Sequence, residues 1–121
     1  MGTKSKYQVQ VHPAVRTEDI PSLPAQLQND FSGYQLAIAR DPYQRRGVPN
    51  HALKGKLRGY RALEIDWEGV AYRLVYRVYE KPSPRRVLVI SFAEHDPAYE
   101  KAIASGTESK IRSRELKIEK S

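Results

Sequence analysis

The sequence of 121 residues contains no cysteine, which excludes disulfide bonds and thiolate metal sites. It also lacks any apolar run close to the roughly 20 residues of a membrane-spanning helix, and residues 1–10 lack the apolar segment of a secretory signal. We therefore expect a cytoplasmic protein. The length and the 40% apolar content suit a single domain with one modest core. We place this domain at residues 1–106 and a charged tail at residues 107–121.

An excess of basic side chains is the second feature of the composition. The net charge is +7, and residues 40–61 carry seven basic side chains against one acidic side chain. Residues 101–121 carry six against three. A basic patch attracts polyanions, among which nucleic acids and acidic proteins are common. An ordinary solubilising surface explains the charge equally well, so composition alone leaves these alternatives open.

The first half of the chain predicts a strand followed by helix. Residues 6–11 alternate polar and apolar side chains, as a strand with one buried face does. Gly33 interrupts the helical pattern, which leaves one helix or two open, and residues 43–56 predict a loop. Ser22 is the candidate N-terminal cap of the helical part, whose apolar stripe is formed by Leu23, Leu27, Phe31, Tyr34 and Ile38.

Three strands and a last helix are predicted in the second half. The strands are Tyr60–Trp67, Val70–Tyr79 and Val87–Phe92, and the tight turns between them favour an antiparallel meander. Asp96 is a candidate cap for the last helix, with Pro97 at its first position. We predict an α+β fold with the order β-α-(α)-β-β-β-α. Its helices should cover one face of the antiparallel sheet and leave the other face as a surface.

Three short motifs occur in order in this second half. They are Leu-Lys-Gly-Lys-Leu-Arg-Gly-Tyr-Arg at 53–61, Tyr-Arg-Leu-Val-Tyr at 72–76 and Val-Ile-Ser-Phe at 89–92. The set resembles the RelE/ParE superfamily of bacterial toxins, in which an L-R-G segment, a Y-R-L-V-Y strand and an apolar strand follow one another. The resemblance implies a RelE-like fold and a type II toxin that cleaves messenger RNA on the ribosome without a cofactor. The implied partners are an antitoxin protein and the ribosome with its mRNA.

The RelE branch of the superfamily shares one of its catalytic positions with this chain. Its strand arginine matches Arg73, whereas its two strand lysines fall on Glu64 and Asp66 and its late arginine falls on His95. Glu64 and Asp66 lie on one strand face, so either carboxylate is a candidate to act as a base or to orient a histidine, unless both form a solvated face. The planar guanidinium of Arg73 suits phosphate binding, and a salt bridge to either acid is the alternative.

The YafQ branch matches at other positions. Its first histidine matches His51, and its late histidine and the aromatic residue after it match His95 and Tyr99. Its second histidine falls on Glu64, and its late arginine falls on Ser91. We predict His95 as the principal acid or base, because an imidazole titrates near neutrality, although an ordinary surface histidine is the alternative. Tyr99 is a candidate to stack on a base unless it packs in the core.

Other basic side chains are candidates for RNA binding rather than catalysis. The predicted RNA-binding residues are Arg45, Arg46, Lys54, Lys56, Arg58 and Arg61. Three dispersed histidines give no metal-ligand spacing, so we predict no metal site.

Two alternative functions remain open. A ParE-like toxin that targets DNA gyrase is one alternative, which the lost lysines favour and His51, His95 and Tyr99 oppose. A non-catalytic RNA- or protein-binding module on the same scaffold is another.

Overall fold

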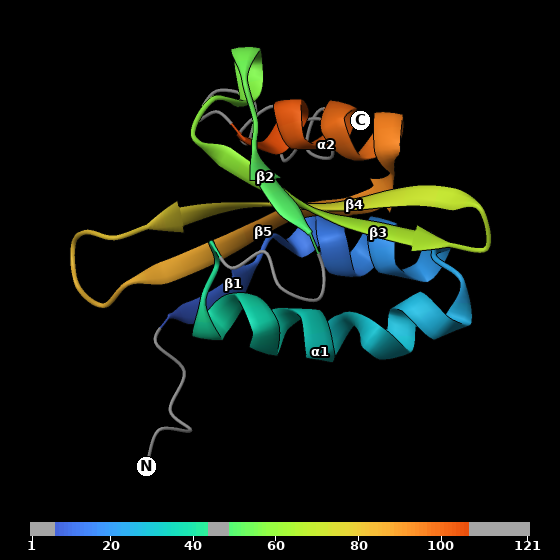
Figure 1. Cartoon of the computed structure of the whole chain (residues 1–121), viewed down its shortest axis with the longest axis horizontal. Helices are drawn as coiled ribbons and strands as arrows, with labels where there is room; N and C mark the ends of the chain where they lie inside the picture. Colours follow the sequence, from blue (N-terminus) through green and yellow to red (C-terminus); the bar gives the residue numbers. More distant parts are fainter. Residues whose placement is uncertain (1–6, 44–48, 107–121) are drawn as a thin grey trace.

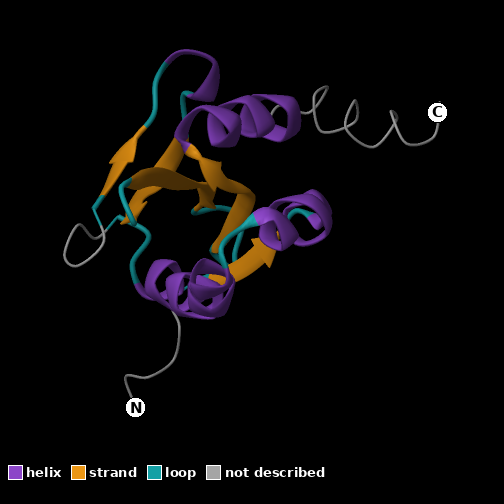
Figure 2. Ribbon diagram, turned by 90° about the vertical axis from the view of Figure 1, so that its right-hand side faces the viewer, coloured by secondary structure: helices purple, strands orange, loops and turns teal. Residues whose placement is uncertain are grey.

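The computed structural model describes residues 7–43 and 49–106. These residues form a five-stranded sheet with helices on both faces (Figures 1 and 2). The predicted tail at 107–121, and Arg45 and Arg46, lie outside the described residues. The strands follow the spatial order β1 (Gln8–Val11), β5 (Arg86–Glu94), β4 (Val70–Tyr79), β3 (Tyr60–Trp67) and β2 (Asn50–Ala52).

The predicted antiparallel meander of the last three strands is confirmed. β3 pairs antiparallel with β4, and β4 pairs antiparallel with β5. The sheet is not wholly antiparallel, because β1 runs parallel to β5 at its edge. The segment 43–56, predicted as a loop, contains β2 and the 3-10 turn η3 (Gly55–Leu57). β2 is only three residues long and forms by pairing with β3, so the local sequence pattern gives little sign of it.

One face of the sheet is covered by α1 (Ala25–Arg40), as predicted from the apolar stripe. Leu27, Phe31 and Ile38 are buried there in one cluster with Leu63 and Leu74 of the sheet. Burial of an aliphatic or aromatic side chain of this size stabilises the fold by about 1.5–3 kcal/mol. The stripe therefore fixes which face of the meander turns toward α1.

α1 is a single helix, and it begins later than predicted. Its backbone passes through Gly33 without a break. Ser22 does not cap it: the hydroxyl of Ser22 donates a hydrogen bond to the carbonyl of Glu18 within a pair of tight turns, η1 (Val15–Asp19) and η2 (Ile20–Ser22). Leu23 is extended, as expected of a residue before proline, and this extended residue delays the start of α1 until after Pro24.

The opposite face of the sheet carries α2 (His95–Gly106), so the prediction that all helices cover one face is wrong. Ala98 and Ala102 of α2 are fully buried against Val75 and Ile90. A β-bulge in β5 accompanies this arrangement. Val75 of β4 pairs with Ser91 and the next residue of β4 pairs with Val89, so Ile90 is the extra residue of β5. Ile90 and Ser91 consequently both face α2, and the Ser91 hydroxyl donates a 2.7 Å hydrogen bond to the Ala98 carbonyl.

A buried carboxylate joins the N-terminal turns to β5 and α2. Asp19 is 1% exposed. Its Oδ2 accepts a hydrogen bond of 3.0 Å from the backbone N–H of Phe92, and its Oδ1 lies 2.9 Å from Nζ of Lys101. Asp19 therefore holds the end of β5 and the middle of α2 in one arrangement.

Within the described residues, no helix is long and apolar enough to cross a membrane.

Candidate functional site

Strand register brings several of the predicted site residues to the α2 face of the sheet. Glu64 pairs with Arg73, and Asp66 pairs with Ala71 two residues away. His51 pairs with Ala62, which is buried in the α2-side cluster. Because paired residues of antiparallel strands point to the same face, the side chains of His51, Glu64, Asp66 and Arg73 all lie on the α2 side. Sequence alternation predicted that the two acids share one strand face, and the register adds His51 to that face.

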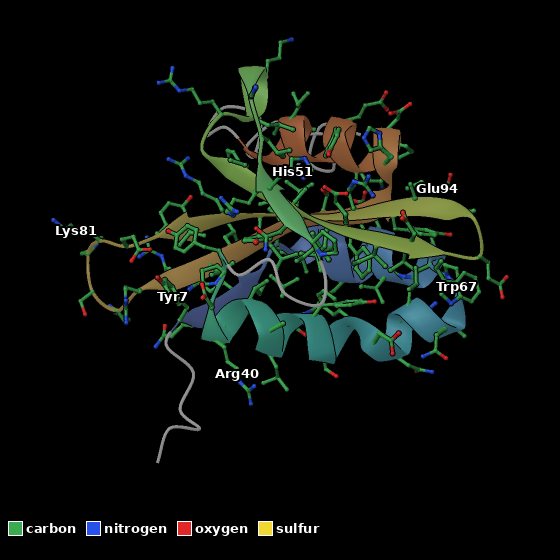
Figure 3. The ribbon with its side chains drawn as sticks, viewed as in Figure 1. Tyr7, Arg40, His51, Trp67, Lys81 and Glu94 are labelled. Atoms are coloured by element: carbon green, nitrogen blue, oxygen red, sulfur yellow. The ribbon has the colours of Figure 1, made fainter. Side chains whose placement is uncertain are left out.

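His51 and Glu64 form the closest contact in this group. Nδ1 of His51 lies 2.6 Å from Oε2 of Glu64, and both side chains remain partly exposed, at 41% and 36%. Within the described residues Nδ1 makes no well-directed hydrogen bond, so the contact is an ion pair when the imidazole is protonated. Figure 3 shows His51 on the side of the sheet that faces α2. The carboxylate is thus placed to stabilise a positive charge on the imidazole while solvent and ligands still reach it.

Arg73 is held between the two acids without being saturated by them. Its Nη2 lies 3.8 Å from Oε1 of Glu64, and its Nη1 lies 3.9 Å from Oδ1 of Asp66, so neither contact is a close hydrogen bond. Nη1 instead donates a 2.8 Å hydrogen bond to the carbonyl of Tyr72. The side chain is 13% exposed, and among the described residues its buried Nε has no hydrogen-bond partner. The two long ion pairs therefore leave Arg73 a guanidinium that is held in place without a close carboxylate partner.

His95 and Tyr99 lie at the start of α2. Nδ1 of His95 is 2.8 Å from Oδ1 of Asp96, and the rings of His95 and Tyr99 meet edge to face with centroids 4.6 Å apart. His95 also lines a pocket of ≈ 370 Å³ together with Ala71. Ala71 precedes Arg73 by two residues on the same face of β4, and the proximity of His95 and Arg73 stays a prediction. The face itself carries α2, and so it is not the helix-free face that the sequence predicted.

The predicted RNA-binding residues divide into two places. Lys54, Lys56 and Arg58 are exposed around η3, which is anchored by the buried Leu57. Arg61 lies elsewhere, because it occupies the α1 face of β3. Its guanidinium donates two hydrogen bonds to Oδ1 of Asn50 and stacks over the ring of Tyr43 at 5.3 Å. The structure therefore separates Arg61 from the basic tip at η3.

Two further observations bear on the chemistry. Ser91, which stands where the YafQ branch has an arginine, is fully buried and donates its hydroxyl to α2, so it lies away from any bound substrate. Among the described residues, no group of three or more histidine, cysteine or acidic side chains is arranged to hold a metal ion. The groups present are imidazoles, carboxylates and a guanidinium, which can move protons and bind phosphate.

The sequence did not single out three residues on the same face farther along β4 and β5. Arg77, Tyr79 and Arg86 stack on one another and on Tyr60. A signal for them existed, since Arg73, Arg77 and Tyr79 are separated by even numbers of residues and therefore share a strand face. The partner strand that completes the set follows only from the register.

Comparison with solved structures identifies the fold. The chain superimposes on a YoeB/ParE toxin from Agrobacterium tumefaciens with a TM-score of 0.58 and 23% identity, over 73% of this chain and 98% of that one. It superimposes on a mutant of E. coli toxin RelE in the free state with a TM-score of 0.56 and 19% identity, over 81% and 95%. A third match is the archaeal RelE-RelB complex from Pyrococcus horikoshii, with a TM-score of 0.55 and 18% identity, over 77% and 99%.

At these identities the matches show a shared architecture, so the predicted α+β, RelE-like fold is confirmed. No protein-family model matches the chain, and no curated protein sequence does.

Proposed function

We propose that this chain is a type II toxin of the RelE/ParE superfamily that cleaves messenger RNA on the ribosome. The observation that carries the proposal is the set of His51, Glu64 and Arg73 on one face of a RelE-like sheet. These side chains supply a proton-transfer group, a carboxylate beside it and a phosphate-binding cation. The fold alone accommodates other functions, so the proposal depends on this site.

The proposed reaction is an internal transfer within the RNA. The 2′-hydroxyl next to the scissile phosphate attacks phosphorus, a 2′,3′-cyclic phosphate forms, and the 5′-oxygen leaves. A base removes the 2′-proton and an acid protonates the leaving oxygen. His51 suits the base, because Glu64 stabilises the charge that the imidazole gains, and His95 suits the acid. Arg73 stabilises the charge that develops on the phosphate.

The surrounding residues suit the binding of a polyanion. Lys54, Lys56 and Arg58 form an exposed basic tip around η3, a few residues after His51 in the sequence, and carry no assigned chemical step. Arg45 and Arg46 stand in the same basic stretch of sequence, and we assign them the same role. Tyr99, partly buried beside His95, is placed to steady that imidazole or to stack on a base. Asp66, which is 79% exposed, modulates Arg73.

The same surface explains how a partner would silence the protein. An acidic antitoxin segment that covers the basic tip and the α2 face would exclude RNA and neutralise part of the +7 charge. One of the matched structures is an archaeal RelE-RelB complex. We therefore propose a cognate antitoxin as the physiological partner, together with the ribosome and its mRNA, in the cytoplasm.

The deciding experiment induces the chain alone in bacteria and follows cleavage of ribosome-bound message by primer extension. We expect growth arrest and cleavage. His95→Ala and His51→Ala should each lower the cleavage rate by about 10²–10⁴-fold, the usual worth of a proton-transfer group. Arg73→Lys keeps the charge next to the two acids but loses the planar fork, so we expect a clear loss of rate without loss of fold.

A matched control removes charge from another part of the molecule. Arg40 is exposed at the end of α1, on the face opposite α2 (Figure 3). Arg40→Ala should therefore cleave like the wild type. Equal cleavage by the wild type and by all three site variants would remove these residues from the mechanism. Inhibition of purified gyrase without RNA cleavage would instead favour a ParE-like toxin, and the absence of growth arrest would favour a non-catalytic binding module.

A further inference from the structure

Four side chains on the α2 face form a continuous stack. They come from β3, β4 and β5, and Figure 1 shows β4 and β5 extending past α2. The Cζ atom of Arg77 lies 5.2 Å from the ring centroid of Tyr60 and 5.1 Å from that of Tyr79. The Cζ atom of Arg86 lies 4.5 Å from the same Tyr79 ring. Tyr60 pairs with Arg77, and Tyr79 pairs with Arg86, so all four share one face. We call Tyr60, Arg77, Tyr79 and Arg86 the arginine–tyrosine ladder.

Among the described residues, no carboxylate neutralises the positive charge of the ladder. In the part of the chain that the structure describes, neither Arg77 nor Arg86 forms an ion pair with an acidic side chain. The nearest acid in sequence, Glu80, is engaged by the hydroxyls of Tyr7 and Tyr43. A hydrogen bond with Tyr60 and the nearby Tyr79 ring raise the pKa of Arg77. The tyrosines thus fix two guanidinium groups while their charge remains available to an anion.

The ladder continues the proposed catalytic site along the same strand. Arg73 and Arg77 are four residues apart on one face of β4, which corresponds to about 13 Å at the usual rise of a strand. The buried Val75 lies between them. One extended nucleic-acid strand is long enough to contact both positions. Alternating cations and aromatic rings are the arrangement with which proteins bind single strands, because arginine contacts phosphate and its plane stacks on bases.

We propose that the arginine–tyrosine ladder binds the single-stranded RNA that leads away from the scissile phosphate. Arg77 and Arg86 contact its phosphates, and their planes together with the exposed part of Tyr79 contact its bases. The identity of the strand as the substrate rests on the proposed function, whereas RNA binding by the ladder does not require cleavage.

The experiment measures binding of a fluorescent single-stranded RNA decamer by the full chain carrying His95→Ala, so that the probe stays intact. Dissociation constants are compared from 50 to 300 mM salt for Arg77→Ala, Arg86→Ala and both together. Each lost phosphate contact should reduce the magnitude of the slope of log K against log salt by about 0.7. The double variant loses two contacts, so its slope should fall in magnitude by about 1.4 and its affinity by roughly tenfold or more. The double lysine variant should keep the slope and lose part of the affinity.

Arg85→Ala is the matched control. Arg85 stacks over the ring of Tyr7 at 4.8 Å, on the α1 side of the same hairpin, so its removal deletes the same charge and the same kind of contact from the other face. It should change RNA affinity less than twofold. Thermal melts of every variant exclude unfolding, and if alanine at position 77 unfolds the chain, the Arg86→Ala and double lysine variants decide.

The outcomes separate the ladder from the proposed function. Unchanged RNA binding by the double variant, or an equal loss in Arg85→Ala, overturns the ladder proposal even if the wild type cleaves message. Loss of binding to a poly-glutamate peptide without loss of RNA binding also overturns it, because the ladder would then be a protein-binding surface. Ladder-dependent RNA binding by a chain that never cleaves message supports the ladder and overturns the nuclease.

Discussion

Replacement of Asp19 by alanine should be one of the most destabilising single changes outside the apolar core. The side chain of Asp19 is 0% exposed, and it connects η1 to β5 and α2, whose contact residues lie more than 70 residues later in the sequence. Its two oxygens accept the backbone N–H of Phe92 at 3.0 Å and contact Nζ of Lys101 at 2.9 Å. The pairing of β1 with β5 ends at Val89, so the N–H of Phe92 lies beyond that pairing and finds its acceptor in Asp19.

The magnitude follows from what each contact loses. A buried N–H deprived of its acceptor costs about 1–3 kcal/mol. The ion pair adds about 1 kcal/mol at most, because the Lys101 side chain is 32% exposed and solvent screens it. We therefore expect Asp19→Ala to lower the free energy of unfolding by about 3 kcal/mol, and the melting temperature by roughly 12 °C for a domain of this size. Asp19→Asn keeps an acceptor for Phe92 and should lose only about 1–2 kcal/mol.

Urea denaturation followed by circular dichroism measures these differences. Lys101→Met and the Asp19→Ala/Lys101→Met double variant complete a mutant cycle that isolates the ion pair from the hydrogen bond to Phe92. Glu100→Ala is the control, because Glu100 is an exposed acid next to Lys101 on α2. An Asp19→Ala variant within 0.5 kcal/mol of the wild type would refute the reasoning, since the buried N–H would then have found another acceptor at no cost.

Three further changes test other parts of the structure. Hydrogen bonds from two tyrosine hydroxyls, with that of Tyr43 the stronger cause, hold the pKa of Glu80 below its ordinary value. The ionised carboxylate therefore stabilises the fold above pH ~4.3, and this stabilisation is lost as pH falls through the folded pKa. The difference in unfolding free energy between wild type and Glu80→Gln, measured in urea, should be larger at pH 7 than at pH 3, and a constant difference would contradict this account. Gly69 has φ +79° in the turn between β3 and β4, so Gly69→Ala should cost about 1–2 kcal/mol in thermal melts, whereas no change would mean that the turn rearranges. Tyr76 is fully buried and donates its hydroxyl to a backbone carbonyl, so Tyr76→Phe should lose about 1 kcal/mol of unfolding free energy, and a more stable variant would oppose this account.

Regular alternation and helical spacing were sufficient to predict the main elements. The strands of the meander and the packing of the α1 stripe on Leu63 and Leu74 follow from single-face burial. The placement of α2 does not, because it depends on the bulge that turns both Ile90 and Ser91 to one face. A period of two residues carries no sign of such an extra residue. The turns around Asp19 escaped prediction for a similar reason, since their partners lie more than 70 residues away.

The candidate site was predictable in its residues more than in its contacts. Sequence alternation placed Glu64 and Asp66 on one face and offered either acid as the partner of Arg73, and the structure shows long ion pairs to both. The contact between His51 and Glu64 depends on β2, a strand that the local sequence did not reveal. The ladder was missed because net charge was counted segment by segment along the chain. Arg77 and Arg86 fall in residues 62–100, where seven acidic residues outnumber five basic ones.

The two acids beside Arg73 give the site a balance that suits phosphate binding. An arginine bound by two close bidentate carboxylates would have few donors left, and an arginine buried without acids would pay a large desolvation cost. Arg73 avoids both extremes, because the carboxylates of Glu64 and Asp66 are present but stay 3.8 and 3.9 Å away from its guanidinium. Asp66 is 79% exposed, so water can solvate it when an anion displaces its contact. The acids thereby hold the guanidinium in place while no anion is bound, and the proposed phosphate would replace the more exposed of them without leaving a charge buried.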